Sequence, residues 1–381
     1  MVGWLLLGIG SSKLMIQLAR LLLGIYAGLG YGSACDFVTE ISHHSIRGQL
    51  SGLVNFSRQL GFLFVYAVGS TSLTWRQLAF FSGGTTLFVP FIGLLGLPDS
   101  PRWLASNQKF DEARKSLVLL RGEIYDVDSE FQLIASNIEK GGEIGSIKQQ
   151  LKEILNPKVL RRFIFLILVY TLFSINGNCS IVTFTATIFK EAENYLNEYQ
   201  STILTGAVRA VGSLLFLVIG DKYSRRRLTQ IPLFFMALCM LSLGFYFYWK
   251  VDHDVSFIRW IPLSSVMIHQ FFVCLTPISF LPCELLPTST RSMAGSIIWL
   301  VSFGSAFVVI FTFPIMQRSI GLHGTFWFYA VNCIVLLLLI ISLLPETRGL
   351  SLEILNEQVK SPIEKSISDT GSSCIESGTI P

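Results

Sequence analysis

Charged residues are scarce in this chain. Only 14% of its 381 residues are Asp, Glu, Lys or Arg, whereas 51% are hydrophobic and the mean hydropathy is +0.57. Soluble domains carry about 25% charged residues. So few charges leave too little polar surface to cover a soluble protein of this length, which favours a membrane protein. The net charge of +4 is small, and its distribution suggests no nucleic-acid partner.

Motifs of catalysis and of cofactor binding are also missing. Polar residues are dispersed among apolar segments, and there is no Gly-rich phosphate loop. The seven cysteines have no metal-ligand spacing and are interpreted as small apolar filler. We therefore expect neither an enzyme nor a nucleotide-driven pump, and we expect no cofactor and no metal.

Long apolar runs are abundant instead. Most of them reach the ~20 residues that an α-helix needs to cross a bilayer. The sequence predicts an all-α integral membrane protein with nine full spans and one short opening span. The runs lie at residues 1–10, 14–36, 50–70, 77–97, 161–187, 202–220, 228–249, 260–283, 294–316 and 324–344.

The basic residues are unevenly shared between alternate loops. Lys and Arg gather in the segment 102–162 and in the cluster of Lys222 with Arg225, Arg226 and Arg227, whereas the intervening loops are poor in them. Because basic loops stay on the cytoplasmic side, this bias predicts a cytoplasmic central loop and a cytoplasmic C-terminal tail. We expect a multi-pass protein of the plasma membrane.

A pair of signatures occurs twice along the chain. Glu40 is followed by Arg47 about two helical turns later, and Glu284 is followed by Arg291 at the same spacing. The stretch Pro98-Asp99-Ser100-Pro101-Arg102 is matched by Pro345-Glu346-Thr347-Arg348. An internal repeat in a very apolar chain points to a transporter.

A polar segment divides the apolar runs into two groups. Residues 98–160 carry apolar residues at helical spacing, which predicts short amphipathic helices against the cytoplasmic face. We expect an N-terminal bundle over residues 1–97, this cytoplasmic segment over 98–160, a C-terminal bundle over 161–345 and a cytoplasmic tail over 346–381.

Together these motifs, with Asp221-Lys222-Tyr223-Ser224-Arg225-Arg226, resemble those of the sugar-porter family of the major facilitator superfamily. Within that family the chain is most similar to the arthropod facilitated trehalose and glucose transporters. The resemblance covers about residues 1–355. It implies the major facilitator fold, in which two helical bundles rock about a midplane solute site and expose it to each side in turn.

The resemblance also implies a cytoplasmic gate, in which acidic and basic residues at helix ends pair across the bundles. The alternative is that these charges end helices among lipid headgroups. The gate residues expected from the family motifs are Glu40, Arg47, Arg102, Asp221, Arg225, Arg226, Glu284, Arg291, Glu346 and Arg348.

The register of the repeat implies that the chain begins inside the family pattern. The family has twelve spans, and about ten are expected here, because the first two and the start of the third have no counterpart. Since the first family helix lines the solute cavity, its absence would open one wall of the site.

Several positions that read sugar hydroxyls in the family depart from its pattern. Gln59 matches, whereas the expected amide pair falls at Phe173 and Ser174, and the Glu position falls at Phe271 beside Gln270. Amides suit sugars because they both donate and accept hydrogen bonds. The candidate solute-binding residues are Gln59, Asn176, Asn178, Arg209, Gln270 and Phe303.

Arg209 occupies a position where the family has Asn. An Arg within a span is costly, so it contacts a solute or forms a structural ion pair, or its side chain snorkels to the membrane surface. The resulting hypothesis is facilitated diffusion of a hexose or of a disaccharide such as trehalose. Two alternatives are a transport-inactive homologue that senses or binds other membrane proteins, and a porter for a non-sugar solute. Proton symport stays open.

Overall fold

The computed structural model describes residues 1–42, 47–122, 127–141, 147–193, 195–220, 223–278, 281–286 and 288–344. Every regular element in these ranges is a helix, which confirms the predicted all-α class. The helices form two compact units. Unit 1 comprises Met1–Ile144, Ile181–Lys222 and Ser242–Leu275, and unit 2 comprises Gly145–Ser180, Tyr223–Leu241 and Thr276–Pro381.

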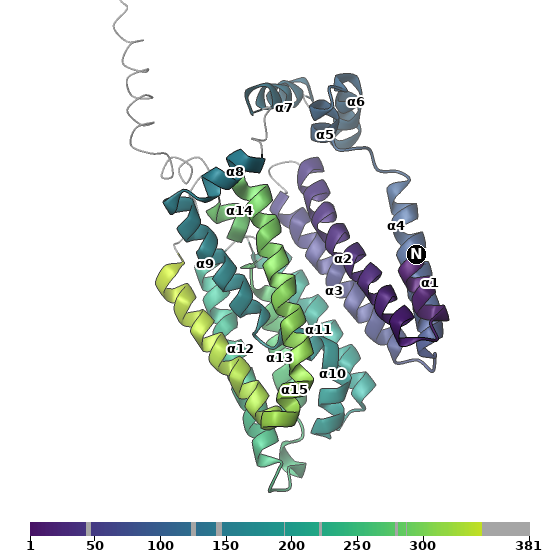
Figure 1. Ribbon diagram of the computed structural model, residues 1–381, viewed down its shortest axis with the longest axis vertical. Helices are drawn as coiled ribbons and strands as arrows, with labels where there is room; N and C mark the ends of the chain where they lie inside the picture. The colour runs from purple at the N-terminus through teal and green to yellow at the C-terminus, as the bar shows by residue number, and fades with distance from the viewer. Residues whose placement is uncertain are drawn as a thin grey trace, which may run out of the picture. The chain divides into compact units, whose positions relative to one another are not determined.

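Four helices at the start of unit 1 lie side by side (Figure 1). They are α1 (Val2–Ile9), α2 (Lys13–Ile41), α3 (Arg47–Gly69) and α4 (Trp75–Leu94). Ser12 caps the start of α2, because its hydroxyl oxygen accepts a hydrogen bond from the Met15 backbone amide at 3.3 Å. Thr74 and Gln77 form a capping box at the start of α4.

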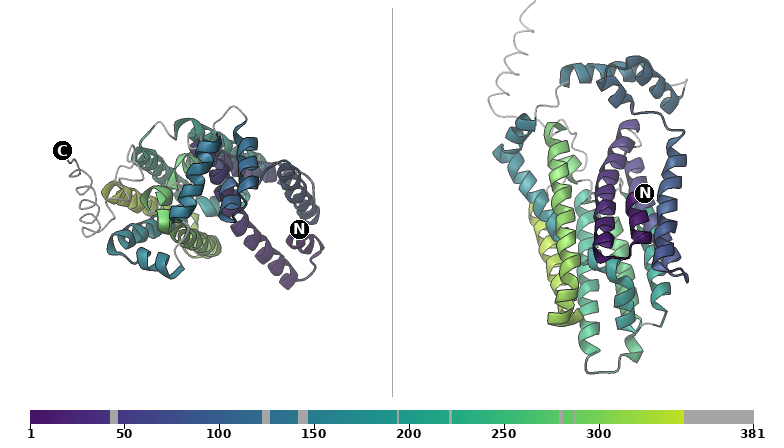
Figure 2. Two further views of the ribbon diagram at one scale, coloured as in Figure 1. Left: turned by 90° about the horizontal axis from the view of Figure 1, so that it is seen from above. Right: turned by 45° about the vertical axis from the view of Figure 1, so that its right-hand side comes forward.

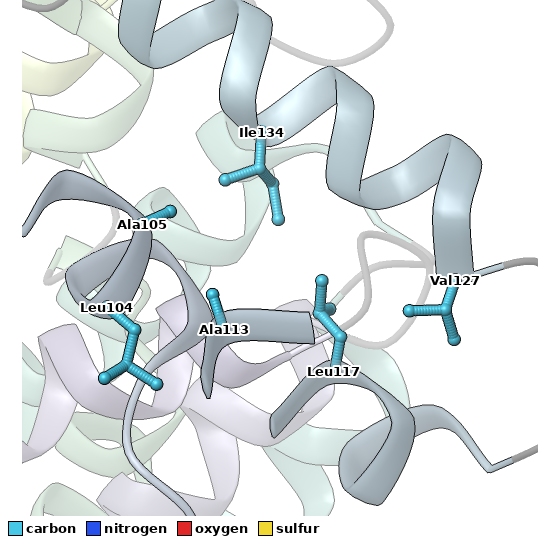
Figure 3. Packing of buried hydrophobic residues seen from close by; sticks show 6 residues of the cluster. All are labelled: Leu104, Ala105, Ala113, Leu117, Val127 and Ile134. Carbon is cyan, nitrogen blue, oxygen red and sulfur yellow. The ribbon is translucent and has the colours of Figure 1, made fainter. Parts of the chain in front are cut away.

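Three short helices of unit 1 form a small subdomain at the end of α2. They are α5 (Pro101–Ser106), α6 (Phe110–Arg121) and α7 (Val127–Gly141). The Pro98–Arg102 motif begins α5, because Ser100 caps the helix and Pro101 occupies its first turn. Figure 3 shows the apolar core between them, made of Leu104, Ala105, Ala113, Leu117, Val127 and Ile134. The described parts of the segment 98–160 are thus largely helical, and its place on the cytoplasmic face stays a prediction.

The remaining helices of unit 1 pack on α3. Here α11 (Glu198–Ile219) lies between α3 and α13 (Ile261–Leu275). The contact is close because a Cβ at Gly206 would lie 2.9 Å from Tyr66 Cδ2, and one at Gly212 would lie 2.9 Å from the Phe271 carbonyl oxygen. Most of α10 (Asn178–Ala192), the second part of α12 (Arg225–Trp249) and the 3₁₀ helix η1 (Ser256–Ile258) complete this unit.

Unit 2 is built around α15 (Thr288–Leu343), which reverses direction at Gly321, where φ is +72°. It packs against α9 (Pro157–Ser174), α8 (Ile147–Ile154) and α14 (Leu281–Leu285) (Figure 2). The first residues of α10 and the first part of α12 belong to the same unit.

Seven helical stretches in the described part of the chain are long and apolar enough to cross a membrane. The last, Met293–Leu343, contains two of the predicted spans, and Pro157–Ala192 contains both α9 and α10. The predicted span at 50–70 forms α3, which is long enough but is not among the seven. Its polar residues Asn55, Arg58 and Gln59 lower its hydropathy.

One predicted span is broken. The apolar run 161–187 divides into α9 and α10 at Ile175, Asn176 and Gly177, where Gly177 has φ +87°. A Cβ at Gly177 would lie 2.9 Å from Tyr329 Cδ2 and 3.2 Å from Met240 Sδ. Glycine is therefore required both by the backbone conformation and by the neighbouring side chains.

Candidate functional site

A row of polar side chains runs along one face of α11. Ser201, Thr205, Arg209 and Ser213 recur one helical turn apart and are all at most 3% exposed. Yet α11 is apolar enough along most of its length to cross a membrane. Polar groups are therefore gathered on the face that α11 turns toward the inside of unit 1.

Arg209 joins α11 to the two helices beside it. Its Nε donates to Gln59 Oε1 on α3 at 3.0 Å, and its Nη1 donates to Gln270 Oε1 on α13. The guanidinium carbon also lies 5.1 Å from the centroid of the Phe62 ring. Gln59 and Gln270 are 1% and 0% exposed. The structure thus brings together three predicted solute-binding residues and excludes a snorkelling Arg209. We call Gln59, Arg209 and Gln270 the amide–arginine cluster.

Further polar groups surround this cluster. Gln59 Nε2 donates to Asn55 Oδ1 at 3.3 Å, and Tyr66 on α3 donates its hydroxyl to the Val182 carbonyl of α10 at 3.1 Å. On α13, the buried His269 has Nδ1 3.5 Å from Gln270 Nε2. Four helices of unit 1, namely α3, α10, α11 and α13, thus contribute to these hydrogen bonds.

Placing an arginine at the centre of a membrane helix costs about 2.5–3.5 kcal/mol on insertion scales. Hydrogen bonds to amide oxygens and the aromatic face of Phe62 offset part of this cost. An ionisable residue kept at such a position is by default a candidate for contact with a solute. The cluster offers guanidinium and amide donors together with amide oxygens, which are the groups that bind hydroxyls and anions.

The other predicted solute-binding residues lie in unit 2. Asn176 is fully buried at the helix break, and its Oδ1 accepts a hydrogen bond from the Asn178 amide at 2.8 Å at the start of α10. Phe303 is 51% exposed and lies beside Trp299, with ring centroids 5.9 Å apart. A role in solute binding remains a prediction for all three residues.

Hydrogen bonds within unit 2 supply partners for backbone carbonyls at the two places where a helix is interrupted. Asn332 Nδ2 donates to the Leu172 carbonyl at 2.7 Å, at the end of α9. The Tyr170 hydroxyl donates to the Ile278 carbonyl at 3.0 Å, between α13 and α14. Buried backbone groups need such partners, so side chains from one helix stabilise the break in another.

Most side chains of the predicted gate lie outside the described part of the structure. Glu40 accepts a hydrogen bond from the Ser100 hydroxyl, Arg102 is exposed, and Arg226 donates to the Ile341 carbonyl. Asp221, Glu346 and Arg348 lie outside the described residues, as do the side chains of Arg47, Arg225, Glu284 and Arg291. The gate stays a prediction.

Sequence reasoning missed a link between the subdomain and α2. Arg121 forms two bonds to the Glu130 carboxylate, at 3.0 and 2.9 Å, and its Nη1 donates to the Ile41 carbonyl at 2.9 Å. A cation at the C-terminal carbonyls of α2 also interacts well with the helix dipole. The Ser100–Glu40 bond adds a second connection. The sequence contains no spacing that predicts these partners, because they lie on different helices.

The exposed Arg114–Asp128 pair joins α6 to α7, with Nε and Oδ1 2.8 Å apart. Its hydrogen bond to Arg114 lowers the pKa of Asp128 below the usual value for a carboxyl.

Among the residues that the structure describes, no cluster of three or more His, Cys, Asp or Glu side chains is placed to bind a metal.

Repeated apolar helices and a buried polar region define a multi-pass integral membrane protein. The chain belongs to the sugar transporter family, since the family profile "Sugar (and other) transporter" matches residues 1–358.

Its relatives include the facilitated trehalose transporter Tret1 of Anopheles gambiae, 32% identical over 92% of this chain and 44% of that protein. The protein of the same name from Culex quinquefasciatus is 31% identical over 92% of this chain and 68% of that protein. The chain thus spans under half of the first relative.

A solved structure has the same fold. The proton:xylose symporter XylE of the major facilitator superfamily, bound to 6-bromo-6-deoxy-D-glucose, has a TM-score of 0.72 at 21% identity. The similarity covers 94% of this chain and 82% of that one. This supports the expected major facilitator fold, with part of its helices present.

Proposed function

We propose that the chain takes part in moving a sugar across a membrane by facilitated diffusion. The observation that carries the proposal is the buried amide–arginine cluster, which α3, α11 and α13 form in a member of the sugar transporter family. Two related proteins are named facilitated trehalose transporters, and the XylE structure holds a glucose derivative, so trehalose and glucose are the first solutes to test.

The chemistry of the cluster supports a polyhydroxylated solute. A sugar hydroxyl both donates and accepts a hydrogen bond, and a Gln side chain supplies the complementary groups. Gln59 and Gln270 are shielded from water, so hydrogen bonds that they make to a solute are strong relative to bonds made at the surface. Binding at such a place suits alternating access, where the site opens to one side at a time.

The charge bias supports an orientation with α5–α8 on the cytoplasmic side of the plasma membrane. In that orientation the bonds of Ser100 to Glu40 and of Arg121 to the Ile41 carbonyl hold the cytoplasmic subdomain against α2. Movement of α2 would therefore carry α5–α7 with it. The predicted ionic gate would act at the same surface.

The test is uptake of labelled trehalose and glucose into proteoliposomes that contain the purified chain. We expect saturable uptake without an imposed pH gradient. Gln59→Ala should lower the uptake rate roughly tenfold or more, which corresponds to losing about 1.4 kcal/mol of binding.

Gln17→Ala is the matched control, because Gln17 is exposed on α2 and the substitution is chemically identical. It should leave the rate unchanged. If neither sugar enters although the protein elutes as a monodisperse species, the proposal is wrong and the non-transporting alternative gains support. An equal loss in both variants would show that Gln59 has no special role.

A further inference from the structure

Both amide oxygens of the cluster are turned toward Arg209. Gln59 Oε1 accepts from Nε at 3.0 Å, and Gln270 Oε1 accepts from Nη1. The opposite ends of these side chains are NH₂ groups, which carry two N–H donors each. Gln59 Nε2 lies 3.3 Å from Asn55 Oδ1, and Gln270 Nε2 lies 3.5 Å from His269 Nδ1. Arg209 therefore fixes the direction in which each amide faces.

This orientation changes what the site offers a solute. A free glutamine presents a donor and an acceptor, whereas a glutamine whose oxygen binds Arg209 presents mainly its NH₂ donor. The guanidinium itself has only donors. The cluster is consequently rich in donors, and a solute with acceptor groups fits it better than one whose hydroxyls must also donate.

We propose that Arg209 is the specificity-determining residue and that the solute is a sugar carrying a carboxylate, such as a hexuronate. This inference rests on the proposed function and refines it. A carboxylate forms charge-assisted hydrogen bonds to a guanidinium that are roughly twice as strong as neutral ones, often through two parallel bonds. It therefore competes successfully with the amide oxygens for Arg209, which a neutral hydroxyl does not.

When a carboxylate replaces the amide oxygens at Arg209, the two amides also become able to bind the sugar ring. Once the carboxylate takes over N–H groups of Arg209, the oxygens of Gln59 and Gln270 become available to accept from ring hydroxyls. A neutral hexose leaves them bound to Arg209. One charged group on the solute thus improves the hydrogen bonding of the rest of the molecule, which gives selectivity beyond the ion pair.

Burial strengthens this discrimination. Arg209 is 3% exposed, so an ion pair formed there is little screened by water or salt. The cost of removing a carboxylate from water is recovered only if its partner is well placed, and Arg209 is held in position from both sides by α3 and α13. Phe62 fixes the guanidinium plane further.

The experiment compares uptake of D-glucuronate and of D-glucose in proteoliposomes with the wild-type chain, Arg209→Gln and Arg209→Lys. We expect wild type to favour glucuronate. Arg209→Gln should reduce glucuronate uptake roughly tenfold or more and raise the ratio of glucose to glucuronate uptake by at least the same factor, because both amides are released. Arg209→Lys keeps the charge but lacks the paired N–H groups of a guanidinium, so its glucuronate uptake should lie between those of wild type and Arg209→Gln.

The outcomes separate this inference from the proposed function. If glucose is transported and glucuronate neither enters nor competes, sugar transport stands and the role of Arg209 in selecting acids is overturned. If acetate uptake depends on Arg209 but no sugar moves, both ideas fail. If Arg209→Gln does not fold, the melting temperature of the wild-type protein is measured with glucuronate and with glucose. A larger rise with glucuronate supports the inference, and a larger rise with glucose refutes it.

Discussion

Gly177→Ala tests whether the break between α9 and α10 depends on glycine. The residue has φ +87°, a region that costs other residues about 1–3 kcal/mol. Its new methyl group would also lie 2.9 Å from Tyr329 Cδ2, and overpacking of a filled site costs about 1–3 kcal/mol. Because the two effects are physically separate, we expect a loss of about 2–6 kcal/mol in the free energy of unfolding.

Three other glycines separate these contributions. Gly122 has φ +83° and nothing within 4 Å of an added Cβ, so Gly122→Ala measures backbone strain alone. At Gly206 the added Cβ would meet Tyr66 at 2.9 Å without a positive φ, so Gly206→Ala measures crowding alone. Gly304 lies on an exposed helical face with neither constraint, and its substitution should be neutral or stabilise by about 0.5–1 kcal/mol.

The measurement is unfolding of the purified protein in mild detergent, followed by tryptophan fluorescence. The order of stability should be Gly304→Ala at or above wild type, then Gly122→Ala and Gly206→Ala, and Gly177→Ala lowest. If Gly177→Ala is as stable as Gly304→Ala, α9 and α10 form a continuous helix and the reasoning about the break is refuted.

Arg121→Ala should destabilise the α5–α7 subdomain by about 1–3 kcal/mol, because the half-buried Glu130 loses its partner. Lys109→Ala removes one side of an exposed ion pair and should change the stability of the subdomain by under about 1 kcal/mol. Both effects are measured by hydrogen exchange, and equal effects would contradict a special role for Arg121. The Arg114–Asp128 pair should stabilise the subdomain above pH ~4, the ordinary value of a carboxyl, and this contribution should vanish as the pH falls through the lowered pKa of Asp128. Hydrogen exchange in α6 should show this acid loss in wild type and not in Asp128→Asn, and the same profile in both would refute it.

Hydropathy predicted the membrane helices well, because a bilayer imposes a length and an apolar composition that can be read locally. The run 202–220 became α11, and 228–249 became most of α12. Hydropathy averaged over the run 161–187 did not reveal the break at Gly177, although Asn176-Gly177 is a dipeptide typical of turns. Its conformation depends on Tyr329 and Met240, which come from distant helices.

The candidate site was predicted in part. Gln59, Arg209 and Gln270 were each proposed separately, from a family resemblance or from the cost of a buried charge, and the structure joins them by hydrogen bonds. The repeat of polar residues along α11 was present in the sequence and could have identified Ser201 and Thr205. The direction of each amide could not, because it depends on which helices flank α11.

The break between α9 and α10 has a consequence for how the protein enters the membrane during synthesis. At a rise of 1.5 Å per residue, the 18 residues of α9 and the 15 of α10 each extend less than the ~30 Å of hydrocarbon. α10 is too short to span alone, and α9 lies at the lower end of the range for a spanning helix, so we expect the two to be inserted together. The Asn332 side chain that satisfies the Leu172 carbonyl is made only when the ribosome has finished much of the second half. Until then the Leu172 carbonyl relies on the Ile175 backbone amide, whose nitrogen lies 3.1 Å away, which leaves the break less well stabilised during insertion into the membrane.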